Sequence, residues 1–483
     1  MIFNSLEFII FFVITFSLYW ALFNRSARWQ NLFIILASYI FYGWLDWRFL
    51  LLIAFTTIST YVLGSNISVQ LNKGNEGGKI ARLLSALNIV LNVGILFVFK
   101  YFNFFIDSFI DACSFFGYNI QITPLRLILP IGISFYTFQA LTYSIDIYQK
   151  KIEPTRDIIS FVAFISFFPQ LLAGPIGRAS KLIPQFEKKR IFDYSEAVDS
   201  IRQMLWGFFK KVAVADTCAI YVNKVFLDYS NQSSAALIVG AILFTIQIYA
   251  DFSGYSDIAI GVGRLFGIKL MRNFNVPYFS RNVAEFWHRW HISLTSWFTD
   301  YIYIPLGGNR VPKWKVVFNT IIVFLVSGLW HGANWTFVVW GAYHALLFIP
   351  GILLFKRTKY KEVVAIDGRV TLKEILGMLL TFILVAIGWV FFNSNTITDA
   401  YYYLSGVFTH SWNDNFSFTI ENKFYVILAC IMFIVEWINR ERDHGLEISY
   451  IKSPVLRIGI YYVLFMAIWC LWGGEQQFIY FQF

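Results

Sequence analysis

Long apolar runs recur along the whole chain and are separated by short polar or charged stretches. A helix needs about 20 largely apolar residues to cross a bilayer, because it must satisfy its own backbone hydrogen bonds where no water is available. The pattern predicts an all-α polytopic membrane protein with about eleven to thirteen transmembrane or re-entrant helices. The expected segments are 6–23, 31–42, 49–62, 84–99, 127–143, 161–172, 235–249, 316–329, 335–355, 375–392, 424–438 and 458–471.

The loops between the first runs differ in their basic residues. Lys and Arg occur in the stretches 25–28, 73–82 and 150–156, whereas the loop 101–124 contains none. Cytoplasmic loops are enriched in Lys and Arg, so this alternation predicts a non-cytoplasmic N-terminus. The run 6–23 has no small-residue cleavage site after it and leads directly into further apolar runs, so we expect it to remain as a membrane helix.

Composition agrees with a membrane protein. Charged residues make up 14% of the chain, against about 25% in an ordinary soluble domain, and hydrophobic residues make up 58%. The formal net charge is +10, but the basic residues lie in short loops, so positive-inside bias explains them better than nucleic-acid binding. The four cysteines have no C-x-x-C spacing and predict neither a disulfide framework nor a zinc site: Cys113, Cys218, Cys430 and Cys470.

The stretch 251–340 is unusual because ionisable side chains crowd into sequence that is otherwise as apolar as a span. Such residues are costly in a membrane. Asp251 and Asp257 open and close the motif DFSGYSD, and two buried carboxylates need water, a cation or hydrogen-bond donors nearby. If 285–301 is one helix, His288 and His291 are i and i+3 neighbours, and Glu285 can pair with Arg289 at i+4.

His331 lies at membrane depth in the motif SGLWHGANW. One interpretation is a core histidine satisfied by a neighbouring carbonyl or hydroxyl group. In a bilayer a functional role is favoured, because burying the polar ring has a cost. Burial pushes imidazole toward its neutral form, which can act as a general base on a hydroxyl group.

Other chemistries are less compatible with the sequence. Glu285-x-x-His288 and Glu441-x-x-His444 match the spacing of di-iron bundles, but the second lies in a charged stretch outside any expected span. Six histidines are too few for a membrane desaturase, so no metal site is expected. The chain has neither a P-loop nor a G-x-S-x-G motif.

Several ordered blocks resemble the membrane-bound O-acyltransferases, and in particular the bacterial branch typified by the alginate O-acetylation membrane protein. The blocks include FFPQLLAGPIGR, GFFKKVAVAD, DFSGYSDIAIG, YIPLGGNR and LWHGANWTFVVWGAYH, together with the longer stretches 130–148 and 273–297. The resemblance implies one membrane domain over 1–483, with a core region 130–345 and helices around a central funnel or channel. It implies that the catalytic residues are His331, as the principal base or acyl-handling residue, and His291.

The role of His291 stays open: it could orient the acceptor, fix the tautomer of His331 or move a proton. The other candidate channel or supporting residues are Asp251, Asp257, Glu285, His288, Arg289, Trp330 and Asn334. The acidic residues, with Asp300, are expected to pair with Arg281, Arg289 or Arg310, or to line the tunnel. The basic residues that could attract an anionic donor or face lipid head groups are Lys210, Lys211, Arg264 and Arg272. His288 departs from the residue that relatives carry before the arginine, so its imidazole could change the proton affinity of His291 or simply form part of the tunnel wall.

The resemblance implies O-acetylation of a cell-surface or secreted polysaccharide, either an alginate-like exopolysaccharide or peptidoglycan. The donor would be acetyl-CoA or another acyl thioester arriving from the cytoplasmic side, with no permanently bound cofactor. A separate extracytoplasmic, esterase-like protein is expected to complete the transfer, and the location would be a bacterial inner membrane. The alternatives are a transporter or flippase, a scaffold without chemistry, and D-alanyl transfer to teichoic acid; the sequence shows no inverted repeat that would favour a transporter.

Overall fold

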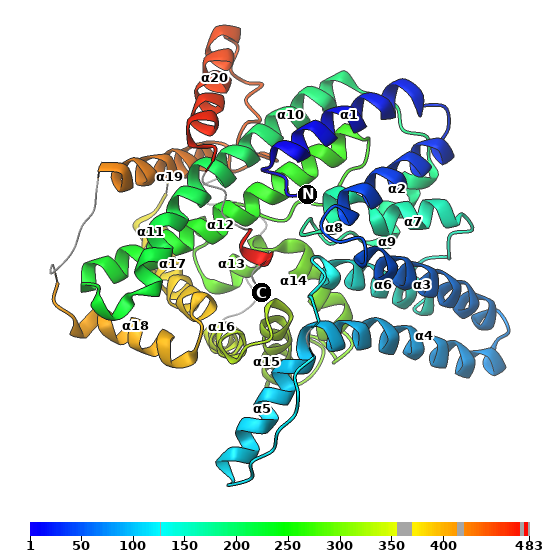
Figure 1. Ribbon diagram of the computed structural model, residues 1–483, viewed down its shortest axis with the longest axis horizontal. Helices are drawn as coiled ribbons and strands as arrows, with labels where there is room; N and C mark the ends of the chain where they lie inside the picture. Colours follow the sequence, from blue (N-terminus) through cyan, green and yellow to red (C-terminus); the bar gives the residue numbers. More distant parts are fainter. Residues whose placement is uncertain (126, 355–369, 413–419, 474–477, 482–483) are drawn as a thin grey trace. The chain divides into compact units, whose positions relative to one another are not determined.

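The computed structural model describes residues 1–125, 127–354, 370–412, 420–473 and 478–481, and every regular element in these ranges is helical (Figure 1). Seven of the described helical stretches are long and apolar enough to cross a membrane. They are Phe49–Leu71, Gly77–Phe115, Ser234–Leu265, Lys313–His331, Trp335–Leu353, Leu372–Asn393 and Pro454–Leu471, and a shorter apolar helix covers Leu6–Leu22. The predicted all-α polytopic membrane fold is confirmed.

The chain forms two compact units. The first contains Met1–Ser200 and Ala259–Met271, and the second contains Ile201–Ile258 and Arg272–Phe483. The helices of the first unit are α1 (Leu6–Leu22), α2 (Ala27–Gly43), α3 (Phe49–Leu71), α4 (Asn75–Leu96), η1 (Phe97–Tyr101), α5 (Phe102–Phe115), α6 (Ile133–Tyr148), α7 (Ile158–Ser166), α8 (Phe168–Leu171) and α9 (Ala179–Glu187). The helix α10 (Tyr194–Phe208) runs from the first unit into the second.

Polar side chains join three helices of the first unit. Asn88 on α4 donates to Ser144 Oγ on α6 at 2.6 Å and accepts from Thr60 Oγ1 on α3 at 3.1 Å. Asn92 donates to both the carbonyl and the side-chain oxygen of Asn88. All four side chains are buried. Hydrogen bonds of this kind join membrane helices whose apolar surfaces gain little from leaving lipid.

Two expected apolar segments and one expected loop of the first unit differ from the structure. The run 127–143 becomes helical only at Ile133, and the run 161–172 is divided between α7 and α8, with Pro169 near the start of α8. The expected loop 101–124 is helical as far as Phe115, because a π-helical turn, η1, joins α4 directly to α5. The hydropathy pattern located the apolar runs correctly. It did not show where a helix is interrupted within a run or where it continues into an expected loop.

The second unit contains the polar stretch singled out in the sequence. Its elements are η2 (Phe209–Ala215), α11 (Asp216–Leu227), η3 (Tyr229–Asn231), α12 (Ser234–Leu265, shared with the first unit), η4 (Pro277–Phe279), α13 (Val283–Arg289), α14 (Ile292–Phe298), η5 (Thr299–Tyr303), α15 (Lys313–His331), α16 (Trp335–Leu354), α17 (Leu372–Asn393), α18 (Ile397–Thr409), α19 (Ile420–Ile438), α20 (Pro454–Leu471) and η6 (Ile479–Phe481). Residue 355, the last of one expected segment, lies outside the described residues. Figure 1 shows α15 and α16 side by side as a helical hairpin.

Candidate active site

His331 is the last residue of α15, at the turn of the α15–α16 hairpin. Two glycines of the SGLWHGANW motif allow this turn to pack closely. A Cβ atom on Gly328 would lie 2.2 Å from the carbonyl oxygen of Phe337, and one on Gly332 would lie 2.0 Å from the Phe337 ring. The motif therefore places the imidazole at a tightly packed helix end, where it is 5% exposed.

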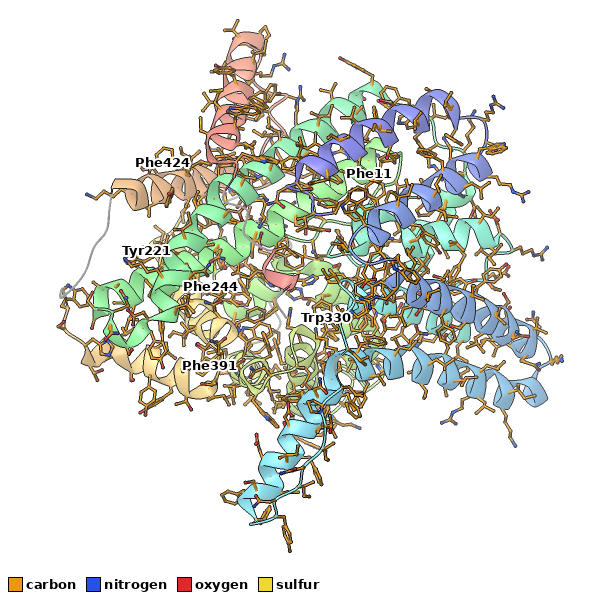
Figure 2. The ribbon with its side chains drawn as sticks, in the orientation of Figure 1. Phe11, Tyr221, Phe244, Trp330, Phe391 and Phe424 are labelled. Carbon is orange, nitrogen blue, oxygen red and sulfur yellow. The ribbon has the colours of Figure 1, made fainter. Side chains whose placement is uncertain are left out.

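The surroundings of His331 are aromatic. Its ring lies 4.9 Å from that of Trp330, 5.1 Å from Trp340, 5.3 Å from Phe392 and 5.5 Å from Tyr480, measured between centroids. Figure 2 labels Trp330 among the crowded side chains of this region. Apolar walls of this kind exclude water, which strengthens electrostatic interactions and protects reactive intermediates from hydrolysis.

His291 lies between two short helices, not within one. The helix α13 ends at Arg289, Trp290 is extended, and His291 has a left-handed backbone with φ of 44°. The expected i, i+3 arrangement of His288 and His291 on one helix is therefore wrong. The side chain of His288 is exposed, whereas that of His291 is 1% exposed.

The hydrogen bonds of Asn273 define the tautomer of His291. Asn273 Oδ1 lies 3.0 Å from His291 Nδ1 and also accepts from the backbone N–H and the hydroxyl group of Ser293. The backbone donor identifies this atom as the amide oxygen, which can only accept, so Nδ1 of His291 carries the proton. His291 Nε2 then has a free lone pair, and this atom has no hydrogen-bond partner within the described residues.

Burial lowers the pKa of His291 to about 3, so the ring is neutral across the physiological range. A neutral imidazole with a protonated Nδ1 and a lone pair at Nε2 is a proton acceptor. This geometry supports a role in moving a proton. It gives no direct hydrogen bond from His291 to His331, because Nδ1 is directed to Asn273 and Nε2 has no described partner.

The two histidines approach the same two aromatic rings. Trp330 lies 5.9 Å from the ring of His291 and 4.9 Å from that of His331. Tyr480 lies 6.3 Å from His291 and 5.5 Å from His331, again between ring centroids. Although they are separated by 40 residues in sequence, the histidines thus belong to one buried aromatic site.

Sequence reasoning missed Tyr480. It lies on η6 near the C-terminal end, with its ring 4.2 Å from that of Phe252 and its hydroxyl group without a hydrogen-bond partner in the described part of the chain. Burial raises the pKa of its phenol well above the ordinary value, so the hydroxyl group keeps its proton at neutral pH. The only sequence signal was the short aromatic end FIYFQF, which is too short to cross a membrane.

Comparison with known proteins identifies the family. A sequence model described as MBOAT, membrane-bound O-acyltransferase family, matches residues 34–366, which include both histidines. The chain belongs to the membrane-bound O-acyltransferase family. It is an O-acyltransferase of the membrane, so the transporter, flippase and scaffold alternatives are set aside.

According to their names, relatives of this O-acyltransferase act on different polymers. The chain is 36% identical over 410 residues to a probable alginate O-acetylase of Pseudomonas aeruginosa, with 85% of this chain and 75% of the relative covered. It is 34% identical to a peptidoglycan O-acetyltransferase of Helicobacter pylori, covering 79% and 74%. A teichoic acid D-alanyltransferase of Bacillus subtilis is 28% identical and covers 56% of this chain and 70% of its own length.

Glu285 stabilises the loop that carries Asn273. Its fully buried carboxylate pairs with Arg281 at 3.0 Å and with Arg289 at 3.0 Å, so the predicted i+4 pair with Arg289 is confirmed. The carbonyl of Arg289 accepts from the backbone N–H of Asn275 at 2.9 Å. Because its carboxylate binds two arginines, Glu285 is a structural anchor, and the Glu285-x-x-His288 pattern does not form a metal-ligand pair.

Asp251 and Asp257 have lysine partners in the acyltransferase, not the expected arginines. Lys211 Nζ lies 2.8 Å from Asp251 Oδ1, and Lys210 Nζ lies 2.6 Å from Asp257 Oδ2. The lysines reach α12 because α10 and α12 cross at glycines: a Cβ atom on Gly254 would lie 2.7 Å from the carbonyl oxygen of Gly207. These carboxylates are thus paired within the unit.

The expectation that Lys210 and Lys211 attract an anionic donor or face lipid head groups is wrong. Both are buried, and Lys211 also pairs with Asp216 at 2.8 Å. Although burial lowers the pKa of Lys211, the carboxylates of Asp251 and Asp216 raise it above its ordinary value overall. Lys210 additionally lies 3.7 Å from Glu436. Lys210 and Lys211 neutralise internal carboxylates.

The remaining candidates have local roles. Asn334 accepts from the backbone N–H of Thr336 at 3.0 Å, near the start of α16, and donates to the carbonyl of Asn395. Arg272 donates to the carbonyl of Phe274 at 2.6 Å. In the first unit, Arg264 pairs with Glu196 and Asp199. Asp300 lies on η5 and is partly exposed, while Arg310 is exposed.

Proposed function

We propose that this O-acyltransferase takes an acetyl group from a thioester donor on the cytoplasmic side, such as acetyl-CoA, for O-acetylation of a cell-surface or secreted polysaccharide. The observation that carries the proposal is the pair of buried histidines at one aromatic site, with the lone pair of His291 Nε2 free to accept a proton. The names of the alginate and peptidoglycan relatives support acetyl as the group transferred.

The chemistry requires a base and a proton donor. A neutral histidine removes the proton from an acceptor hydroxyl group, whose oxygen then attacks the thioester carbonyl. The new C–O bond forms as the C–S bond breaks, and the leaving thiolate takes up a proton from the imidazolium. We assign His331 as the principal base, on the match of its motif to the family, and His291 as the second proton-transfer group. The surrounding rings keep water away from the reacting carbonyl.

The acceptor is proposed to be an alginate-like exopolysaccharide or peptidoglycan, and the membrane to be the inner membrane of a bacterium. A separate extracytoplasmic esterase-like protein would complete the transfer onto the glycan. D-alanyl transfer to teichoic acid remains a weaker candidate, because the D-alanyltransferase relative covers 56% of the chain, against 85% and 79% for the two acetyl-transferring relatives.

The test is the ester-linked acetyl content of envelope and secreted polysaccharide in cells with the intact gene, a deletion or His331→Ala at matched protein levels. We expect the deletion and His331→Ala to abolish the ester, because the base is lost. A matched control is His410→Ala, since this histidine contacts the carbonyl of Gln232 through Nδ1 and belongs to a different part of the unit. Unchanged acetyl content in normally inserted His331→Ala protein would contradict the proposal, and ester-linked D-alanine in place of acetate would favour the second candidate.

A further inference from the structure

The C-terminal segment 478–481 is fixed in the second unit through its backbone as well as its rings. The N–H of Ile479 donates to Asp251 Oδ2 at 2.7 Å. Ile479 begins η6, where an N–H group has no acceptor within the helix, so the carboxylate satisfies a donor that would otherwise be buried and unpaired. On one side of this bond, the ring of Phe478 stacks 4.7 Å from that of Tyr255.

Asp251 is itself a buried charge oriented by a cation. Its side chain forms an ion pair with Lys211 through Oδ1 and accepts a hydrogen bond from the backbone N–H of Ile479 through Oδ2. Lys211 is shared with Asp216, so one ammonium group serves two carboxylates. A second donor to Asp251 therefore lowers the cost of burying its negative charge. The backbone of Ile479 supplies that donor.

We propose that Asp251, oriented by Lys211, is a positioning residue that docks the C-terminal segment 478–481 and thereby places the ring of Tyr480 near both histidines. The bond uses the main chain, so it fixes the register of the segment whatever the side chain at 479. Residues 478 and 480 then direct their rings to Tyr255 and to the histidines. The effect on transfer rests on the proposed function, whereas the docking does not.

Hydrogen exchange at the C-terminal end measures the docking directly. In the full-length protein in lipid nanodiscs, the amide of Ile479 should be protected, and Asp251→Ala should accelerate its exchange roughly tenfold or more, because a hydrogen bond to a charged acceptor is lost. The matched control is Asp257→Ala, which removes another lysine-paired carboxylate on the same helix, although its side chain is 14% exposed against 3% for Asp251. Its Ile479 exchange should stay within about twofold of wild type. Equal protection in Asp251→Ala and wild type would overturn the docking.

Ile479→Pro removes the donor and leaves the charge cluster intact, which separates positioning from folding. The short helix η4 already begins with Pro277, so a proline at the first position of such a turn is tolerated in this chain. Ile479→Ala keeps the N–H and serves as the control. We expect Ile479→Pro to lower kcat for acetyl transfer about tenfold with little change in the KM for the donor, and Ile479→Ala to lower it much less.

The double variant Asp251→Ala, Ile479→Pro decides whether the two residues act through one bond. Its loss of kcat should be close to that of the larger single loss, because both substitutions remove the same contact. Losses that multiply, or equal kcat in Ile479→Pro and Ile479→Ala, would overturn the positioning role. If the wild-type protein transfers no acetyl group, the proposed function fails, and the exchange measurement still decides the docking.

Discussion

The backbone of His291 has a conformation that few residues with a side chain adopt, and it is fixed from outside. The N–H of Ile292 donates to the carbonyl of Asn273 at 2.8 Å, while the side chain of Asn273 accepts from the imidazole and from Ser293. A left-handed residue of this kind persists when its surroundings over-determine it, and such residues cluster at functional sites. This strained backbone places Nδ1 of His291 against the side-chain amide of Asn273 and leaves Nε2 available to accept a proton.

Burial of neutral His291 makes a testable contribution to the pH dependence of stability. Its folded pKa, about 3, lies below the ordinary value of 6.5, so the unfolded chain binds the extra proton first as the pH falls. The stability associated with the neutral ring is therefore complete above about pH 6.5 and declines toward pH 3, by up to about 1.4 kcal/mol per pH unit. His291→Gln should remove this dependence.

The measurement is the midpoint of thermal unfolding of wild type and His291→Gln in the same detergent between pH 8 and pH 4.5. The difference between the two proteins isolates His291 from the other titrating groups. We expect wild type to lose stability faster than the variant below pH 6.5. Parallel curves for the two proteins would mean that His291 is charged or solvated in the folded state.

At the scale of helices, close packing through small residues and buried polar bonds replaces the hydrophobic effect that is missing between helices in lipid. The α15–α16 hairpin relies on Gly328 and Gly332, and the crossing of α10 and α12 relies on Gly254. In the first unit, Asn88 joins α3, α4 and α6 through side-chain bonds. These contacts fix how the helices pack within each unit, and the chemistry depends on that packing.

Replacing Asn88 with leucine should destabilise the first unit by about 1–2 kcal/mol, because its bonds to Thr60 and Ser144 are lost together. Asn66→Leu is the matched control, since Asn66 is exposed on α3 and donates only to a carbonyl of its own helix among the described contacts. The check is resistance to a protease added in mild detergent, followed by the rate of cleavage in the first unit. Equal cleavage of the two variants would show that the Asn88 bonds add little.

Across the whole molecule, the sequence predicted the class of fold, and it singled out two histidines that the structure places at one buried aromatic site, since apolar runs and motif blocks are local signals. It could not predict contacts between distant residues. Tyr480 follows His331 by about 150 residues, and nothing local relates them. The lysine partners of Asp251 and Asp257 were missed because a helix crossing, not sequence spacing, brings them together. The left-handed turn at His291 was missed because EFWHRWHISL also fits a continuous helix.

The orientation of the chain in the membrane follows from the same positive-inside argument, now with corrected boundaries. The helix α4 has 22 residues, about 33 Å at 1.5 Å per residue, which is enough to cross the hydrocarbon core of about 30 Å. Its start and the turn after α5 should therefore lie on opposite sides of the membrane.

In a protein whose four cysteines are replaced by serine, Asn119→Cys and Lys79→Cys both introduce thiols at exposed positions. A membrane-impermeant thiol reagent added to intact cells should label Asn119→Cys and leave Lys79→Cys unlabelled until the cells are opened. The reverse pattern would place the N-terminus in the cytoplasm. It would also put the basic loops on the outside, against the positive-inside bias on which the orientation rests.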